Sequence, residues 1–311
     1  MLASDVGPNL EKVVEYIVAK SAFQKKAVFR LLENGDPQYL EFAELVVERL
    51  NRALGNHEGV HAYLADCYLN YTKAIRIEEM YFAKENKYRQ SEFDKVYEEI
   101  YGNNNYMAEY VAGLGMTQIF WLNHYAIFRF FLDQFLPLIQ GARTGAEIGV
   151  GHGLFHSELL RLTPGLRTTL LDISPVSLDT TRKMIAAAGV DPERTTSILC
   201  DVQKEIPLED GSLDVLLMGE LIEHIQEGRA VMTKLGDKMR PDGFCFFSTA
   251  ANAPAQDHIL LFRDTGEIRS FIAACGWKIL KEQTGTINNI SLEKAEREGH
   301  NINYVAVLTK A

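Results

Sequence analysis

The stretch AEIGVGHGLF, residues 146–155, decides the fold that we expect for this chain. Three glycines, Gly149, Gly151 and Gly153, follow a short apolar run and precede a helix-like segment. Glycine suits such a turn because the backbone must adopt dihedral angles closed to other residues and let a ligand approach closely. Leu154 stands where the G-x-G-x-x-G dinucleotide fingerprint requires its third glycine. The turn therefore predicts a nucleotide-like ligand and disfavours nicotinamide and flavin cofactors.

Acidic residues end the apolar runs that follow this turn. Residues 167–172 (RTTLLD) end in Asp172, and residues 195–200 (TTSILC) are followed by Asp201. A carboxylate that ends the second strand of a βαβ unit accepts hydrogen bonds from ribose hydroxyls, and Asp201 stands where a carboxylate can bind the amine of an adenine. A third run, residues 213–218 (LDVLLM), leads into Gly219 and Glu220. Since open α/β sheets bind ligands at the carboxyl ends of their strands, these residues predict one site.

From about residue 141 to its end, the chain resembles the class I, Rossmann-like S-adenosylmethionine-dependent methyltransferases. The resemblance rests on the acid after the second strand, on E-x-G-x-G-x-G at 147–153, on Asp-Val at 201–202 and on GELIEH at 219–224. It implies S-adenosylmethionine as the cofactor, with the glycine turn at its methionine half, Asp172 at the ribose, and Asp201 with Val202 at the adenine. The cofactor-binding residues that we expect are Glu147, Gly149, Gly151, Gly153, Asp172, Ile173, Asp201, Val202, Gly219 and Glu220.

Composition restricts the partners of the chain. The 311 residues carry a formal net charge of −10 and no basic tract, which disfavours nucleic acid because phosphate contacts supply most of that affinity. Residues 1–8 show no secretory signal, so we expect a cytoplasmic protein that acts on a small molecule. The four cysteines have no C-x-x-C spacing, which predicts reduced thiols and no metal site. Composition does not indicate the oligomeric state.

The amino-terminal part of the chain reads as helix nearly throughout. Apolar residues recur at three- and four-residue spacing over 10–27 and again over 39–54. The aromatic segment 116–138 contains Asn123, His124, Arg129 and Asp133, so we expect a buried helix there and no membrane span. We therefore expect an all-helical cap over residues 1–140 and a cofactor-binding domain over 141–311.

The second half alternates between helical and strand patterns. Helices are expected over 174–188, 228–239 and 264–275, a turn over 240–243, and strands over 244–248, 277–286 and 304–308. The polar stretch 288–301 is expected to be a loop or a short helix. This alternation predicts an α/β fold, with a Rossmann-like, doubly wound and mostly parallel sheet beside the helical cap.

Candidate catalytic and substrate residues lie outside the cofactor motifs. His224 follows the fourth expected strand and is a candidate general base, although it also suits a capping or packing role beneath the cofactor. Asn123 is a second candidate, in an aromatic segment whose rings at helical spacing equally suit a packed core. The candidate substrate residues are Tyr71, Trp121, His124, Tyr125 and Asn252; the last also suits a turn without any ligand.

Three functions are compatible with these residues. The first is methyl transfer to a small molecule, of the kind found in specialised metabolism, by in-line displacement at the sulfonium methyl. The second is cyclisation of the cofactor's aminobutyl chain to azetidine-2-carboxylate with release of methylthioadenosine. The helical cap, the stretch Asn123-His124-Tyr125 and the polar loop around Asn252 resemble such enzymes. The third is cofactor binding without turnover. Methyl transfer is our leading interpretation. The sequence does not separate it from cyclisation, because both reactions need the same cofactor-binding residues.

Overall fold

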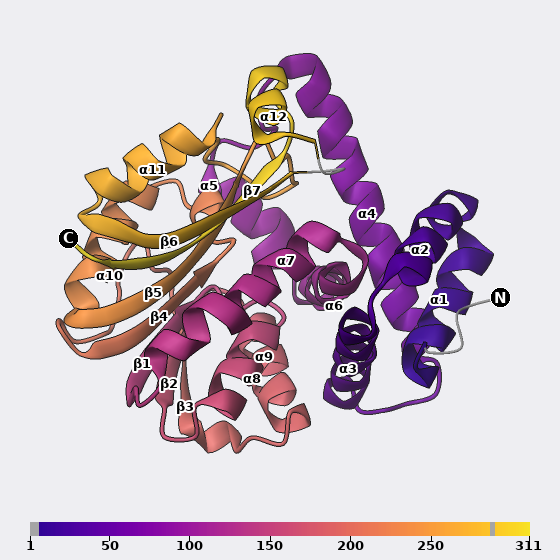
Figure 1. Cartoon of the computed structure of the whole chain (residues 1–311), viewed down its shortest axis with the longest axis horizontal. Coiled ribbons are helices and arrows are strands. Elements are labelled where there is room, and N and C mark those ends of the chain that lie inside the picture. The colour runs from indigo at the N-terminus through magenta and orange to yellow at the C-terminus, as the bar shows by residue number, and fades with distance from the viewer. Residues whose placement is uncertain (1–5, 287–289) are drawn as a thin grey trace.

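The computed structural model describes residues 6–286 and 290–311 and contains one seven-stranded sheet (Figure 1). Its strand order is β3-β2-β1-β4-β5-β7-β6, and β7 runs in the direction opposite to the other strands. The order reverses between β1 and β4, which is the position where open α/β sheets bind ligands. The strands are β1 (Thr144–Ile148), β2 (Arg167–Asp172), β3 (Thr195–Leu199), β4 (Leu213–Gly219), β5 (Met239–Ala251), β6 (Trp277–Thr286) and β7 (Ile302–Lys310).

Alternate side chains of the strands enter two apolar layers. On β4, Val215 and Leu217 face one layer, while Leu216 and Met218 face the other. This period of two follows from strand geometry, and it buries both faces of the sheet beneath helices. Helices α8 (Leu154–Leu162) and α9 (Pro175–Ala187) contribute to the first layer; α10 (Gly228–Lys238), α11 (Thr265–Ala274) and α12 (Leu292–Glu298) contribute to the second. The predicted Rossmann-like α/β fold is confirmed.

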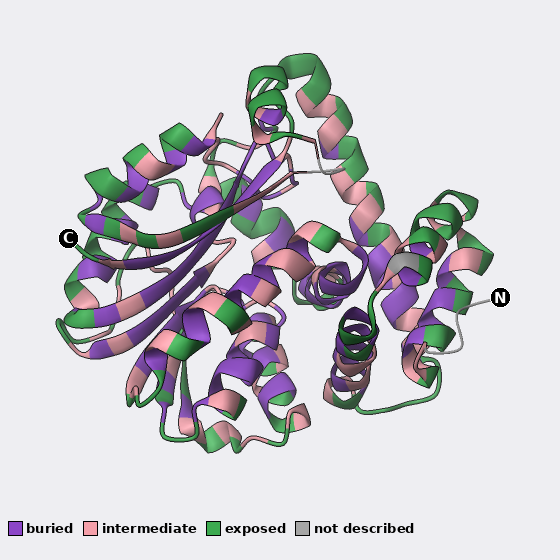
Figure 2. Ribbon diagram, viewed as in Figure 1, coloured by how far each residue is buried: buried purple, intermediate pink, exposed green. Residues whose placement is uncertain are grey.

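The amino-terminal segment is helical and packs beside the sheet (Figures 1 and 2). The long α4 packs against α6, and α3 and α6 pack against α9. Buried Arg49 of α3 forms an ion pair with buried Glu158 of α8. The helices are α1 (Pro8–Lys20), α2 (Ala22–Asn34), α3 (Pro37–Ala53), α4 (Val60–Glu85), α5 (Phe93–Val96), α6 (Asn104–Phe120) and α7 (Leu122–Phe130).

Short irregular helices complete the connections. The π-helices η1 (Tyr97–Tyr101) and η2 (Phe131–Phe135) continue α5 and α7, and η3 (Leu136–Ile139) leads into β1. The 3₁₀-helices η4 (Pro192–Arg194) and η5 (Ile222–His224) precede β3 and follow β4. Within the described ranges, no helix has the length and apolar character needed to cross a lipid bilayer.

The structure corrects three boundaries. The pattern over 10–27 is broken at Ser21, whose extended backbone separates α1 from α2 and whose hydroxyl accepts a hydrogen bond from the Gln24 amide. The segment 116–138 is divided at Trp121, which also has an extended backbone. Residues 240–243 belong to β5, beside a register shift between β4 and β5, so the expected turn there was wrong. Of the polar stretch 288–301, residues 288 and 289 lie outside the described ranges, and α12 forms within the rest.

Candidate functional site

A cavity of about 1650 Å³ opens at the carboxyl ends of β1, β2 and β4. All ten residues that the sequence predicted to bind the cofactor line it, although they come from four separate segments of the chain. Aromatic and polar side chains from α4, α6 and α7 line it as well. The cavity therefore lies between the glycine turn and the amino-terminal helices.

The glycine turn needs glycine for different reasons at its positions. Gly149, Gly151 and Gly153 all have positive φ, at 71°, 48° and 72°. A Cβ on Gly153 would lie 2.7 Å from the Thr181 Cα, so this residue lets α8 begin directly against α9. A Cβ on Gly151 would meet only Leu114 Cδ2, at 3.9 Å, and Gly151 lines the cavity. The missing side chain of Gly153 therefore serves packing, and that of Gly151 leaves room for a ligand.

Asp172 holds the glycine turn in place. Its Oδ2 accepts a hydrogen bond from the Val150 amide at 2.8 Å, and its Oδ1 accepts one from the Ser174 amide at 2.7 Å. Burial raises the pKa of Asp172 to about 6, against the opposing effect of these backbone donors. Each carboxylate oxygen has a further lone pair, so the side chain can bind the turn and a ligand hydroxyl together.

Glu147 reaches away from the turn into a buried network beneath it. Its Oε2 lies 2.7 Å from His156 Nδ1, and His156 Nε2 lies 2.7 Å from Thr168 Oγ1. Burial raises the pKa of Glu147, and His156 opposes this shift. Glu147 thus connects β1, α8 and β2 while one side of it borders the cavity.

The other predicted cofactor residues lie at the ends of β2, β3 and β4. Ile173 directly follows β2, and Gly219 ends β4. Asp201 and Val202 are half-buried after β3, and Asp201 Oδ1 accepts a hydrogen bond from the Gln203 amide at 3.0 Å. Asp201 Oδ2 lies 3.1 Å from the exposed Lys204 Nζ. These residues lie at the carboxyl ends of the strands, which is the edge of the sheet where the sequence predicted the site.

Two carboxylates lie close together after β4. Glu220 has a left-handed backbone with φ 48°, which is uncommon for a residue other than glycine and is frequent at functional sites. Burial raises the pKa of Glu220, and burial followed by the charge of Glu220 raises the pKa of Glu223 well above its ordinary value. Oε1 of each is buried without a hydrogen-bond partner among the described residues.

His224 lies in a polar cluster that joins three parts of the chain. Its Nδ1 is 3.1 Å from the Tyr101 hydroxyl and 3.2 Å from the Asp257 carbonyl oxygen. The hydroxyls of Tyr101 and Tyr110 donate to Asp257 Oδ2 at 3.0 and 2.7 Å. Burial alone would raise the pKa of Asp257, but nearby His224 and His258 and the two tyrosine hydroxyls lower it. The cluster holds an ionised carboxylate in the cavity wall.

The aromatic candidates form the opposite wall. Tyr71 packs against Trp121 with ring centroids 5.9 Å apart, and Trp121 packs edge-on against His124 at 4.9 Å. Burial, together with the charge of His152, lowers the pKa of His124 to about 3, so its imidazole is neutral. Tyr125 packs against Phe42 and also borders the cavity. These rings offer apolar faces to a ligand.

Asn123 and Asn252 differ in placement. Asn123 borders the cavity and donates from Nδ2 to Asn303 Oδ1 at 2.7 Å. Asn252 is absent from the cavity lining, has φ 49° and donates from Nδ2 to the Arg263 carbonyl oxygen at 2.7 Å. That geometry is the turn role that asparagine fills without a ligand. The placement of Asn252 gives its predicted substrate contact no support.

Sequence reasoning missed four residues of the polar cluster: Tyr101, Tyr110, Asp257 and His258. Asp257 and His258 lie in the loop after β5, and their contacts with His224 depend on the tertiary fold. Tyr101 ends η1 and Tyr110 lies in α6, and both lie more than a hundred residues from Asp257 in the sequence. A local sequence pattern does not predict contacts between residues so far apart in the chain.

Comparison with known proteins agrees with this architecture. Residues 146–247 match the methyltransferase domain family. The ubiquinone biosynthesis O-methyltransferase of Xanthomonas euvesicatoria is 28% identical over 117 residues, which are 38% of this chain and 46% of that protein. The same enzyme of Nitrosococcus oceani is 28% identical over 108 residues, 35% of this chain and 44% of that protein. The chain thus spans less than half the length of these relatives.

A solved structure extends the comparison of the fold. The phosphoethanolamine N-methyltransferase 2 of Haemonchus contortus, in complex with phosphomonomethylethanolamine and S-adenosylhomocysteine, superposes with a TM-score of 0.51 at 13% identity. The superposition covers 71% of this chain and 61% of that one. Fold and site together define a Rossmann-like domain with a cavity at the switch point of the sheet, where open α/β sheets bind ligands. More particularly, residues 146–247 are a methyltransferase domain of the class I type.

Proposed function

We propose that this protein binds S-adenosylmethionine in the cavity and transfers its methyl group to a small molecule of specialised metabolism. The observation that carries the proposal is the cavity itself, which joins the glycine turn to the aromatic wall of the helical segment. Single-ligand pockets commonly have volumes of about 300–1,000 Å³, so about 1650 Å³ has room for a cofactor and an acceptor. The curated relatives, named as ubiquinone biosynthesis O-methyltransferases, support a small-molecule acceptor.

The residues of the site fit this cofactor. Gly151 leaves backbone open to the cavity, and Asp172 keeps free lone pairs for ribose hydroxyls after binding the turn. Asp201 with Val202 would lie at the adenine. The sulfonium is a cation, and the faces of Tyr71 and Trp121 attract cations with about 0.5–2 kcal/mol according to exposure. The cofactor supplies an electrophilic methyl group.

The chain's own contribution is to position the acceptor and exclude water. The amino-terminal helices close one side of the cavity, and good alignment of reactants lowers a barrier by about 7–11 kcal/mol. His224 would accept a proton at Nε2, because its Nδ1 faces the Asp257 carbonyl and therefore carries the hydrogen. Tyr101 and Asp257 would hold this tautomer in place.

The size of the cavity is also why we place cyclisation second. An intramolecular reaction of the cofactor needs no room for a second molecule, and a close-fitting pocket would serve it best. One incubation separates the candidates: the purified chain is mixed with S-adenosylmethionine, with and without a panel of phenolic and amine acceptors, and products are quantified by mass spectrometry. S-adenosylhomocysteine formed only with an acceptor supports transfer. Methylthioadenosine formed without an acceptor supports cyclisation and refutes our proposal.

Binding is tested separately by calorimetry. Asp172→Asn is compared with Asp179→Asn, an exposed aspartate on α9 that pairs with Lys183 outside the cavity. We expect Asp172→Asn to lose about 1–3 kcal/mol of cofactor binding and Asp179→Asn to bind like the unmodified protein. Equal affinity in both variants would remove Asp172 from the site.

A further inference from the structure

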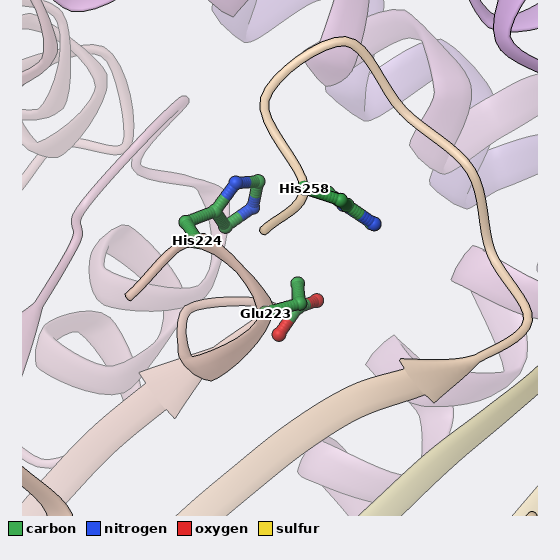
Figure 3. Close-up of side chains that lie close together, drawn as sticks. All are labelled: Glu223, His224 and His258. Atoms are coloured by element: carbon green, nitrogen blue, oxygen red, sulfur yellow. The ribbon is translucent and has the colours of Figure 1, made fainter. Parts of the chain in front are cut away.

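Two loops at the carboxyl edge of the sheet bring three metal-ligating side chains together. Glu223 and His224 follow β4, and His258 lies in the loop after β5 (Figure 3). Each offers one ligand atom, and these atoms all lie within 4.8 Å of one another. In the part of the chain that the structure describes, no other group of three or more histidines, cysteines or carboxylates has this spacing.

Both imidazoles make the kind of Nδ1 contact with a carbonyl oxygen that metal-bound histidines commonly make. His258 Nδ1 lies 2.6 Å from the Ala253 carbonyl oxygen, and His224 Nδ1 lies 3.2 Å from the Asp257 carbonyl oxygen. A ring that donates its Nδ1–H to a carbonyl keeps the lone pair on Nε2. Metal-ligating histidines almost always donate their other ring N–H to such an oxygen, which fixes both tautomer and orientation.

The carboxylates nearby have acceptor atoms without a donor. Glu223 is fully buried, and its Oε2 accepts a hydrogen bond from the Thr249 hydroxyl at 2.8 Å. The second oxygen of Glu223 and Oε1 of Glu220 are buried and accept no hydrogen bond from a donor group of the described chain, and the two carboxyl groups interact with each other. Two buried carboxyl groups that face each other need either a shared proton or a cation between them. The two imidazoles beside them favour a cation, because they add nitrogen ligands at the same place.

We propose that Glu223, His224 and His258 bind one divalent first-row transition-metal ion. Two imidazole nitrogens and one carboxylate form a mixed ligand set that suits manganese, iron, cobalt or zinc better than magnesium or calcium. Metal–ligand distances of about 2.0–2.2 Å put neighbouring ligand atoms roughly 3.0–3.5 Å apart. The ligand atoms, which now lie within 4.8 Å of one another, would therefore move about 1 Å closer together around the ion.

The site has an open side. His224 and Glu220 border the cavity, as does His258, so an ion held there has coordination positions that face the ligand space. A metal ion lowers the pKa of a bound hydroxyl and orients it. On the proposed function, the ion would therefore hold an oxygen atom of the acceptor, and it would activate that oxygen in place of His224, because its bond to Nε2 occupies the lone pair that would otherwise accept a proton. Metal binding itself does not depend on that function.

The first experiment measures binding without cofactor or acceptor. Chelator-treated protein is titrated with Mn²⁺ and followed by electron paramagnetic resonance of the free ion, and Co²⁺ is followed by its visible absorption. We expect one site per chain, and Mg²⁺ in excess should not displace the bound ion. Glu223→Gln and His258→Ala should each weaken binding by more than about tenfold, whereas His57→Ala, at an exposed histidine of the amino-terminal segment, should bind normally.

A second measurement uses the unaltered protein, so that a misfolded variant cannot hide the answer. Substoichiometric Mn²⁺ should broaden the imidazole proton resonances of His224 and His258 before those of His57. Absence of a stoichiometric site for Mn²⁺, Co²⁺ and Zn²⁺, or broadening of His57 first, would overturn the proposal and leave Glu223 as a neutral buried acid. Neither result bears on whether S-adenosylmethionine binds, which the calorimetry above decides.

Discussion

Alanine substitutions at two glycines of the same turn should have different consequences. Gly153 and Gly151 both have positive φ, so an alanine at either position takes on the left-handed backbone, at a cost of about 1–2 kcal/mol. Only at Gly153 does the new Cβ meet backbone, 2.7 Å from the Thr181 Cα. Forcing a methyl group into such a packed contact costs a further 1–3 kcal/mol or so. We therefore expect Gly153→Ala to lose roughly 2–5 kcal/mol and Gly151→Ala roughly 1–2 kcal/mol.

Equilibrium unfolding in urea measures both losses. The midpoint should fall further for Gly153→Ala, with an unchanged slope, because neither substitution alters the surface that unfolding exposes. Circular dichroism and tryptophan fluorescence should give coincident transitions if a single free energy is to be quoted. Equal losses of stability in the two variants would refute the assignment of Gly153 to packing against α9.

Cofactor affinity should rank the two variants in the opposite order. Gly151 lines the cavity and has open space where its Cβ would lie, so a methyl group there occupies ligand volume. Calorimetry with S-adenosylmethionine, without urea and at a temperature where both variants are folded, should show the larger loss of cofactor affinity for Gly151→Ala. Full affinity in Gly151→Ala would contradict the placement of the cofactor at this turn.

Three further predictions concern individual side chains. Because burial raises the pKa of Asp172 to about 6, cofactor affinity should fall as the pH drops below 6, and calorimetry should show a flatter profile in Asp172→Asn. Burial raises the pKa of Glu158, but its arginine partners outweigh this effect and lower the pKa, so the ion pair stabilises the fold above the ordinary pKa of 4.5 and is lost on acidification. Glu158→Gln leaves Arg49 buried without its counter-charge and should cost about 3–5 kcal/mol in urea unfolding. The variant should also lose part of the pH dependence of stability in acid, and an unchanged dependence would count against the ion pair of Glu158 with Arg49. Asn252→Ala should lower the free energy of unfolding by about 1–3 kcal/mol, because the hydrogen bond to the Arg263 carbonyl is lost. The affinities for cofactor and acceptor should be unchanged, and a weaker affinity for the acceptor would restore the predicted substrate role of Asn252.

The cofactor side of the cavity could be predicted because its residues follow strands in sequence. Each parallel strand ends at the same edge of the sheet, so a motif after β1, an acid after β2 and another after β3 necessarily converge. Sequence order thus carries spatial information for Gly149, Asp172 and Asp201. The second role of Asp172, as acceptor for the Val150 and Ser174 amides, is a matter of side-chain geometry that order alone does not give.

The other side of the cavity could not be predicted, for a physical reason. Tyr101 and Tyr110 reach Asp257 across about 150 residues of chain, and that distance is set by how the helices pack on the sheet. Helical periodicity identifies which face of a helix is apolar but not which partner that face meets. Trp121 illustrates the limit, since its aromatic neighbours suggested one helix while its extended backbone ends α6 and starts α7.

The division that we proposed at residue 140 separates two stretches of sequence, but the apolar core crosses it. Phe131 and Phe135 of the helical segment pack against Phe246 of β5 with ring centroids 5.3 and 5.6 Å apart. The same buried cluster extends from α1 to β7, so removing the helices would expose one face of the sheet to water. A segment bound in this way is poorly suited to swing open as a whole. The aromatic wall that contains Trp121 is therefore held by the same packing that supports the glycine turn. On the proposed function, selection of the acceptor would be built into the core of the fold.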